Sequence, residues 1–241
     1  MLKTLSAAVL GLMCGSAYAQ SVDAPSLKAG DSWVYAETVE TGPQGFSSKN
    51  TLMTVERVSS QTMLVSSKQD GSNQPPVESL TGLDWSRSRD INGKQQVVNR
   101  PLAFPLSEGK TWTVEYTELN PNRQHSSETI HNDYVVTGWE NVEVPAGKFK
   151  ALKIESEGQW SAMLVPVAVA GAQAVVTPGQ VTTISNAQRV AARPASGRLY
   201  KAFWYVPEQK RFVKSVEEYY DNKGVRSQRF SEELKSSKLA G

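Results

Sequence analysis

Apolar and polar residues alternate along much of this chain with a period of two, which is typical of strands with one buried face. The clearest case is DYVVTGWENVEV, in which Tyr134, Val136, Val142 and Val144 share one parity and the other parity is mostly polar. Gly138 interrupts the alternation, as expected where a strand bulges. The pattern predicts a long strand with a break in its register.

The sequence VPAG at 144–147 is typical of a hairpin turn rather than of a reactive site. Pro145 fixes φ near about −65°, and Gly147 can adopt the positive φ that closes a hairpin. In the returning strand the parity slips between Ala151 and Leu152. We therefore expect a bulge there, or burial on both faces of the strand.

Further runs of the same type predict strands over most of the chain. The C-terminal part contains three runs separated by the turn clusters PEQK and DNKG, which predicts an antiparallel meander. No long segment has apolar residues at helical spacing. The fold class is therefore predicted to be all-β or mainly β, with strands near 31–40, 50–58, 61–68, 94–99, 111–119, 198–206, 211–220 and 225–233.

One segment departs from this pattern, because residues 158–188 contain no charged side chain. Its apolar stretch is broken by Pro166 and Gly171 and is shorter than the ~20 residues that cross a bilayer. The segment is either a buried strand or two with an Ala/Gly connector, or an apolar flap that covers a groove or contacts a partner. The candidate ligand or partner surface consists of Trp160, Met163, Leu164, Val165, Val167 and Val169.

The first residues have the pattern of a secretory signal peptide. Lys3 precedes an apolar run over 5–13, and Ala17–Ala19 forms a small-x-small cleavage site. We expect cleavage after Ala19, which leaves a single β-rich domain over 20–241 with an uncharged apolar insertion at about 158–188. The expected location is the periplasm, with secretion as the alternative, and no transmembrane segment remains after cleavage.

The composition argues against cysteine-based sites and against a nucleic-acid partner. The only cysteine, Cys14, would leave with the signal peptide, so the expected mature chain has no disulfide and no thiol nucleophile. Lipidation at Cys14 is disfavoured because Met13 occupies the position where a small residue is expected. Lys and Arg number 26 against 24 Asp and Glu, and they are interspersed. No basic stripe that could neutralise phosphates is visible, so we do not expect nucleic acid as a partner.

Imidazole chemistry is limited to two histidines. His125 and His131 form H-x5-H-x-D with Asp133, which could supply three metal ligands, but structural sites normally have closer ligand pairs. The surrounding segment is polar, so we interpret these side chains as solvated and predict no metal and no cofactor. Glu217 and Glu218 are adjacent on a predicted strand and would point to opposite faces. We assign no catalytic residues.

Five short motifs occur in an order that resembles a known group of proteins. They are GDSWVY at 30–35, FPL at 104–106, GKTW at 109–112, VPAGKF at 144–149 and WYVP at 204–207. Together they are similar to uncharacterised exported bacterial β-sheet proteins, whose architecture resembles the curled antiparallel sheet of lipoprotein-localisation carriers. The resemblance implies a large curved antiparallel sheet, or incomplete barrel, built from hairpins and meanders. The resemblance also implies a periplasmic location, and it implies no catalytic residues.

These observations favour a non-enzymatic periplasmic binding or interaction module. Its concave apolar face would bind a lipophilic ligand or an envelope protein. Two alternatives stay open. One is a hydrolase that acts on an envelope polymer through an Asp/Glu acid–base pair, and the other is a structural subunit of an envelope complex.

Overall fold

The structure is a computed structural model that describes residues 21–42, 45–177 and 180–241, except for the side chains of 167–190. The predicted signal peptide and Cys14 lie outside the described residues. Among the described residues, no helix has the length and apolar character needed to cross a bilayer. The strands are β1 (Ser32–Glu40), β2 (Phe46–Val58), β3 (Thr62–Gln69), β4 (Val77–Gly82), β5 (Arg87–Ile91), β6 (Lys94–Asn99), β7 (Thr111–Leu119), β8 (His125–Val144), β9 (Gly147–Leu164), β10 (Val167–Thr177), β11 (Gln180–Val190), β12 (Arg193–Val206), β13 (Arg211–Tyr220) and β14 (Arg226–Lys238).

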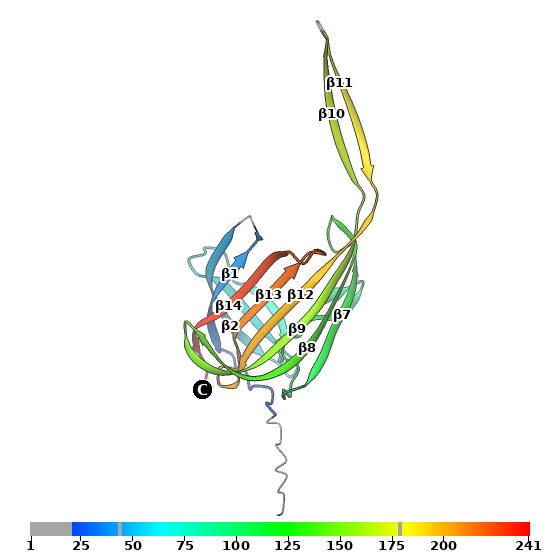
Figure 1. Cartoon of the computed structure of the whole chain (residues 1–241). Coiled ribbons are helices and arrows are strands. Elements are labelled where there is room, and N and C mark those ends of the chain that lie inside the picture. The colour runs from blue at the N-terminus through cyan, green and yellow to red at the C-terminus, as the bar shows by residue number, and fades with distance from the viewer. Residues whose placement is uncertain (1–20, 43–44, 178–179) are drawn as a thin grey trace, which may run out of the picture.

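Ten of these strands form one antiparallel sheet in the order β4-β3-β2-β1-β14-β13-β12-β9-β8-β7. In the described part of the chain the outer strands β4 and β7 do not pair with each other, so the sheet curls without closing (Figure 1). The predicted large curved antiparallel sheet, or incomplete barrel, is confirmed. The C-terminal meander is confirmed as well, because β12, β13 and β14 are consecutive neighbours.

Irregularities in the register help the sheet to curl. An extra residue bends its strand and increases the local twist. One such break lies between Val136 and Gly138, and Gly138 has φ +129°, where the sequence predicted an interruption. Ala151 and Leu152 are both buried, so the slip in parity there reflects burial on both faces.

The hydrophobic core lies on the concave side of the sheet, where the segment that links β4 to β7 covers it with Leu83 and Trp85 before β5 and with Leu102, Phe104 and Leu106 after β6. Trp85, which precedes β5, packs edge-on against Trp33 of β1 with ring centroids 5.3 Å apart. The indole N–H of Trp33 donates to the carbonyl oxygen of Gln209 at 2.9 Å, and that of Trp85 to Lys210 at 3.1 Å. The two tryptophans therefore fasten β1 and the covering segment to the β12–β13 turn.

Strands β10 and β11 form a separate two-stranded sheet within the uncharged segment. They pair over their full length, from Val167 with Val190 to Thr177 with Gln180. The hairpin extends from the ends of β9 and β12, on the opposite side of the molecule from the C-terminus (Figure 1). Its side chains lie outside the described residues, so the choice between flap and buried core stays a prediction.

The β8–β9 turn gives a direct test of the turn prediction. Val144 pairs with Gly147, and Gly147 has φ +131° with open space where a side chain would stand. A β-branched residue resists this backbone conformation. We expect Gly147→Val to lower the free energy of unfolding by about 1–3 kcal/mol, measured by urea denaturation. The control is Lys148→Val, at an exposed strand position. Equal stability of the two variants would show that the turn imposes no strain.

Candidate ligand-binding site

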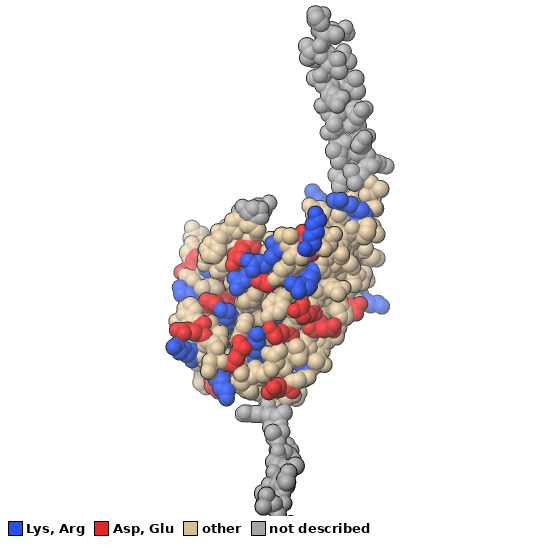
Figure 2. Space-filling view, in the orientation of Figure 1, with Lys and Arg blue, Asp and Glu red and all other residues tan. Residues whose placement is uncertain are grey.

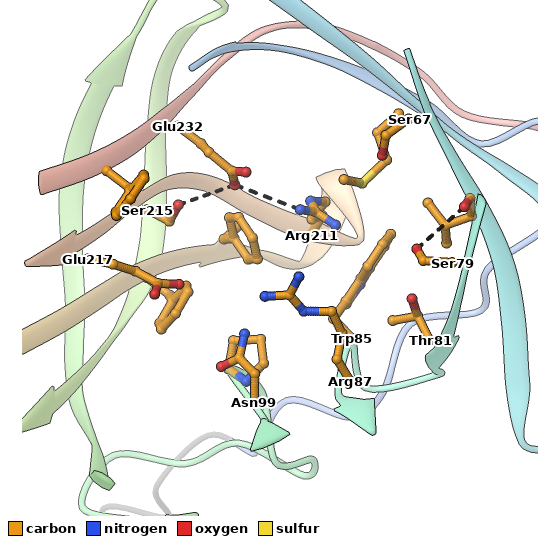
Figure 3. A pocket seen from close by; sticks show the side chains of 16 residues that line it. Ser67, Ser79, Thr81, Trp85, Arg87, Asn99, Arg211, Ser215, Glu217 and Glu232 are labelled. Atoms are coloured by element: carbon orange, nitrogen blue, oxygen red, sulfur yellow. Dashed lines mark hydrogen bonds and ion pairs between the residues drawn. The ribbon is translucent and has the colours of Figure 1, made fainter. Parts of the chain in front are cut away.

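A cavity of about 200 Å³ lies on the concave face, between the curled sheet and the segment that covers it (Figure 3). The sheet contributes residues from β2, β3, β4, β12, β13 and β14, and the covering segment contributes residues from 85–101. Apolar and polar groups share the walls, so the cavity is amphipathic. The apolar lining residues are Met53, Val65, Trp85, Pro101, Phe203, Phe212 and Phe230, and the polar ones are Ser67, Ser79, Thr81, Arg87, Asn99, Arg211, Ser215, Glu217 and Glu232.

Arg211, the first residue of β13, is held in a fixed position inside the cavity wall. Only 5% of the residue is exposed. Its Cζ lies 4.2 Å from the ring centroid of Trp85 and 4.3 Å from that of Phe212. Its Nε donates to the Tyr35 hydroxyl at 3.1 Å, and that hydroxyl donates to the Phe212 carbonyl oxygen at 2.6 Å. Burial raises the pKa of Tyr35, so the phenol stays neutral and serves as donor and acceptor.

Glu232 of β14 faces Arg211 across the cavity. Its Oε2 lies 3.8 Å from a terminal nitrogen of Arg211 and accepts a hydrogen bond from Ser215 Oγ at 3.2 Å. Burial raises the pKa of Glu232, and the positive charge of Arg211 opposes that rise. The alternation of β14 places Glu232 inside, while its neighbour Glu233 pairs with Lys214 at 2.7 Å.

A second carboxylate, Glu217 of β13, also lines the cavity. It pairs with Lys201 of β12 at 3.1 Å, and the Lys201 side chain is only 10% exposed. The adjacent Glu218 instead pairs with Arg226 at 2.9 Å and Arg229 at 3.3 Å. Both carboxylates that line the cavity are therefore matched by a buried or nearly buried cation.

Arg87 of β5 is an exposed residue that lines the cavity and is its one charged lining residue without an ion pair among the described residues. It forms no ion pair and no hydrogen bond with the other described residues. Its side chain extends from β5 toward the middle of the cavity (Figure 3). Asn99 of β6 pairs with Arg87 in the strand register and also lines the cavity. Guanidinium groups bind carboxylates and phosphates in a two-pronged geometry, so this wall can receive an anion.

The surface that the sequence predicted lies away from this cavity. Trp160, Met163 and Leu164 occupy the end of β9 and Val165 follows them, and none of these four lines the cavity. Trp160 donates its indole N–H to the carbonyl oxygen of Tyr220 at 3.2 Å, and 39% of Met163 is exposed. The remaining two candidates, Val167 and Val169, belong to β10, and their side chains lie outside the described residues.

The two histidines and Asp133 are not brought together as one metal site. His125 Nδ1 contacts Glu128 at 2.7 Å, whereas His131 lies 2.9 Å from Asp133 and 3.1 Å from Glu115. Hydrogen bonds with Asp133 and then Glu115 raise the pKa of His131. Within the described part of the chain, no three His, Cys, Asp or Glu side chains are arranged to hold a metal ion.

Sequence reasoning considered Glu217 but missed the other three charged residues that line the cavity, Arg87, Arg211 and Glu232. Arg87 lies in a segment whose alternation was too weak to predict β5, and Arg211 directly follows the turn cluster PEQK, where a basic residue is ordinarily solvated. A signal was present in β13, in which Arg211, Ser215 and Glu217 share one parity. When every second residue of a strand points to the concave side of a sheet, polar residues at those positions indicate a cavity with polar walls. On the face of the molecule that Figure 2 shows, charges of both signs are intermixed.

Neither a family model nor a curated protein matches the chain. Among solved structures, it is similar to a candidate lipoprotein from Parabacteroides distasonis ATCC 8503, with 14% identity, a TM-score of 0.47 and coverage of 91% of this chain and 100% of the other. It is also similar to a candidate exported protein with a YmcC-like fold from Bacteroides fragilis NCTC 9343, with 15% identity, a TM-score of 0.42 and coverage of 91% and 100%. The hypothetical lipoprotein YmcC from Escherichia coli (K12) has 11% identity, a TM-score of 0.32 and coverage of 87% and 86%.

These similar proteins are exported or lipoprotein-like β-sheet proteins without an established activity, as the resemblance of the five motifs predicted. At these TM-scores the likeness says nothing about a ligand or a reaction. Any ligand or reaction of this chain must therefore be inferred from its own residues.

Proposed function

We propose that the chain is a non-enzymatic binding module of the cell envelope whose concave cavity receives a small amphipathic ligand. The observation that carries this proposal is the mixed lining of the cavity, in which aromatic rings such as Phe203 and Phe230 stand beside polar groups. Ligand sites commonly combine an apolar wall with a few polar groups that fix orientation. The periplasmic location rests on the signal-peptide pattern of the first 19 residues.

The volume of the cavity restricts the ligand. At about 200 Å³ it is smaller than the roughly 300–1,000 Å³ of sites for drug-sized molecules. A single short acyl chain or an aromatic acid therefore suits it better than an entire phospholipid. This narrows the lipophilic ligand expected from the sequence to a small molecule, or to one short chain of a larger one.

The hydrolase alternative has one observation in its favour, since Glu217 and Glu232 line the same cavity. A pair of carboxylates at one site is the usual acid–base arrangement of glycoside hydrolases. Each carboxylate already has a structural partner, however, in Lys201 and Arg211 respectively. Binding therefore accounts for the cavity with fewer assumptions than catalysis.

Filling the cavity tests the binding function. The probe is 1-octanol, a neutral amphipathic molecule, and the measurement is isothermal titration calorimetry. Ser67 lines the cavity, whereas Lys68 is exposed and its side chain points to the other face of β3. We expect Ser67→Trp to weaken octanol binding at least tenfold and Lys68→Trp to leave it unchanged. Equal binding by both variants, or no saturable binding to the unaltered protein, would refute the proposal.

A further inference from the structure

The charges around the cavity leave one cation without a counter-ion. Arg211 faces Glu232 at 3.8 Å, and Lys201 faces Glu217 at 3.1 Å. Arg87 is the fifth charged group, and among the described residues it has no carboxylate partner. Arg87 is exposed to solvent as well as lining the cavity, so water can solvate its charge until an anion with its own apolar part displaces that water.

Packing at the start of β5 fixes the position of Arg87. Trp85, two residues earlier, adopts φ +61° and is packed against Trp33, so the start of β5 is fixed. Two residues later on the same strand, Arg89 pairs with Glu118 at 2.5 Å. One arginine of β5 thus has a carboxylate partner, while the arginine directed into the cavity has none.

Asn99 supplies a second donor beside Arg87. The two residues are paired in the β5–β6 register, and both line the cavity. Asn99 Oδ1 accepts a hydrogen bond from the Tyr134 hydroxyl at 3.4 Å, which assigns the amide NH₂ as the group that remains to donate. A guanidinium and an amide side by side form a donor set for an oxyanion.

We propose that Arg87 and Asn99 bind the anionic group of the ligand, a carboxylate or a phosphate, while Phe203, Phe212 and Phe230 contact its apolar part. This inference rests on the proposed function and names its ligand class: short-chain amphipathic anions. The aromatic residues lie on β12, β13 and β14, across the cavity from β5 and β6. An elongated ligand would therefore place its two ends against opposite walls.

Three probes of equal chain length test the ligand class: octanoate, octyl phosphate and 1-octanol. Titration calorimetry at pH 7.5 should show at least one of the anions binding tenfold or more tightly than octanol, and the tighter anion distinguishes carboxylate from phosphate. Arg87→Gln should remove this preference by weakening the anions more than octanol, so that the affinities of the anions and of octanol for the variant lie within twofold of one another. Arg89→Gln, on the same strand with its own partner, should leave the preference intact, and Arg87→Lys should retain part of it.

The outcomes separate this inference from the function on which it rests. If Arg87→Gln keeps the full preference for anions, or if no anion exceeds octanol, Arg87 is not the anion site, although octanol binding that is sensitive to Ser67→Trp would still support the binding function. If none of the three probes binds, both the ligand class and the function of the cavity are wrong. Thermal unfolding of each variant shows whether a loss of binding comes from a loss of fold.

Discussion

Replacing Asp31 with alanine is expected to lower the free energy of unfolding by about 3–5 kcal/mol, because it leaves a nearly buried ammonium group without its partner. Asp31, the residue before β1, is completely buried. Its Oδ2 lies 3.0 Å from Lys210 Nζ and accepts the Lys28 amide at 2.9 Å, and its Oδ1 accepts the Ala240 amide at 2.7 Å. One carboxylate thus ties the N-terminal segment, the β12–β13 turn and the C-terminus together.

The effect is measurable by thermal and urea denaturation. A chain of this size loses roughly 2–4 °C in Tm for each kcal/mol, so Asp31→Ala should melt about 6–20 °C lower. Asp31→Asn keeps the acceptor oxygen but removes the charge, so an intermediate loss is expected. Asp221→Ala is the control, because that carboxylate only accepts the amides of Lys223 and Val225 in its own turn. A loss for Asp31→Ala no larger than for this control would contradict the assigned role.

The sequence predicts the strands where burial alternates and the turns where glycine and proline occur. Gly147 and Gly138 have the positive φ and the register break that their positions implied. Strands β4 and β5 were not predicted, because most of their side chains are exposed and the period of two is lost. An alternating sequence pattern arises where a strand buries one of its faces. Strands β4 and β5 bury little of either face, so no such pattern is present.

The candidate site shows a different limit of sequence reasoning. Adjacent Glu217 and Glu218 were predicted to face opposite sides, and their separate partners, Lys201 and Arg226, agree with that prediction. The sequence could not indicate that Glu217 and Arg87 would line one cavity. Their strands β13 and β5 are distant in the chain and meet only because the sheet curls over its covering segment.

Replacing Arg211 with methionine is the second change expected to have a large effect, at about 3–5 kcal/mol near pH 7. Methionine keeps apolar contact with Trp85 and Phe212 but removes the charge that faces Glu232. Burial, with Glu37 and Glu217 adding to it, already raises the pKa of Glu232, and Arg211 opposes that rise more than the hydrogen bond from Ser215 does. The Glu232 side chain is 29% exposed, and without Arg211 its carboxylate is left without a counter-ion.

The cost of Arg211→Met should therefore depend on pH with a definite sign. Because the pKa of Glu232 in the folded variant would lie further above its unfolded value, protonation favours the folded state, and the loss of stability at pH 7 should shrink toward pH 5. Adding Glu232→Gln should recover most of the loss at pH 7, since it removes the unpaired charge. Lys214→Met, which breaks a partly exposed pair with Glu233, should cost no more than about 1 kcal/mol. A loss for Arg211→Met that grows on acidification, or that persists in the double variant, would show that packing rather than charge dominates at this position.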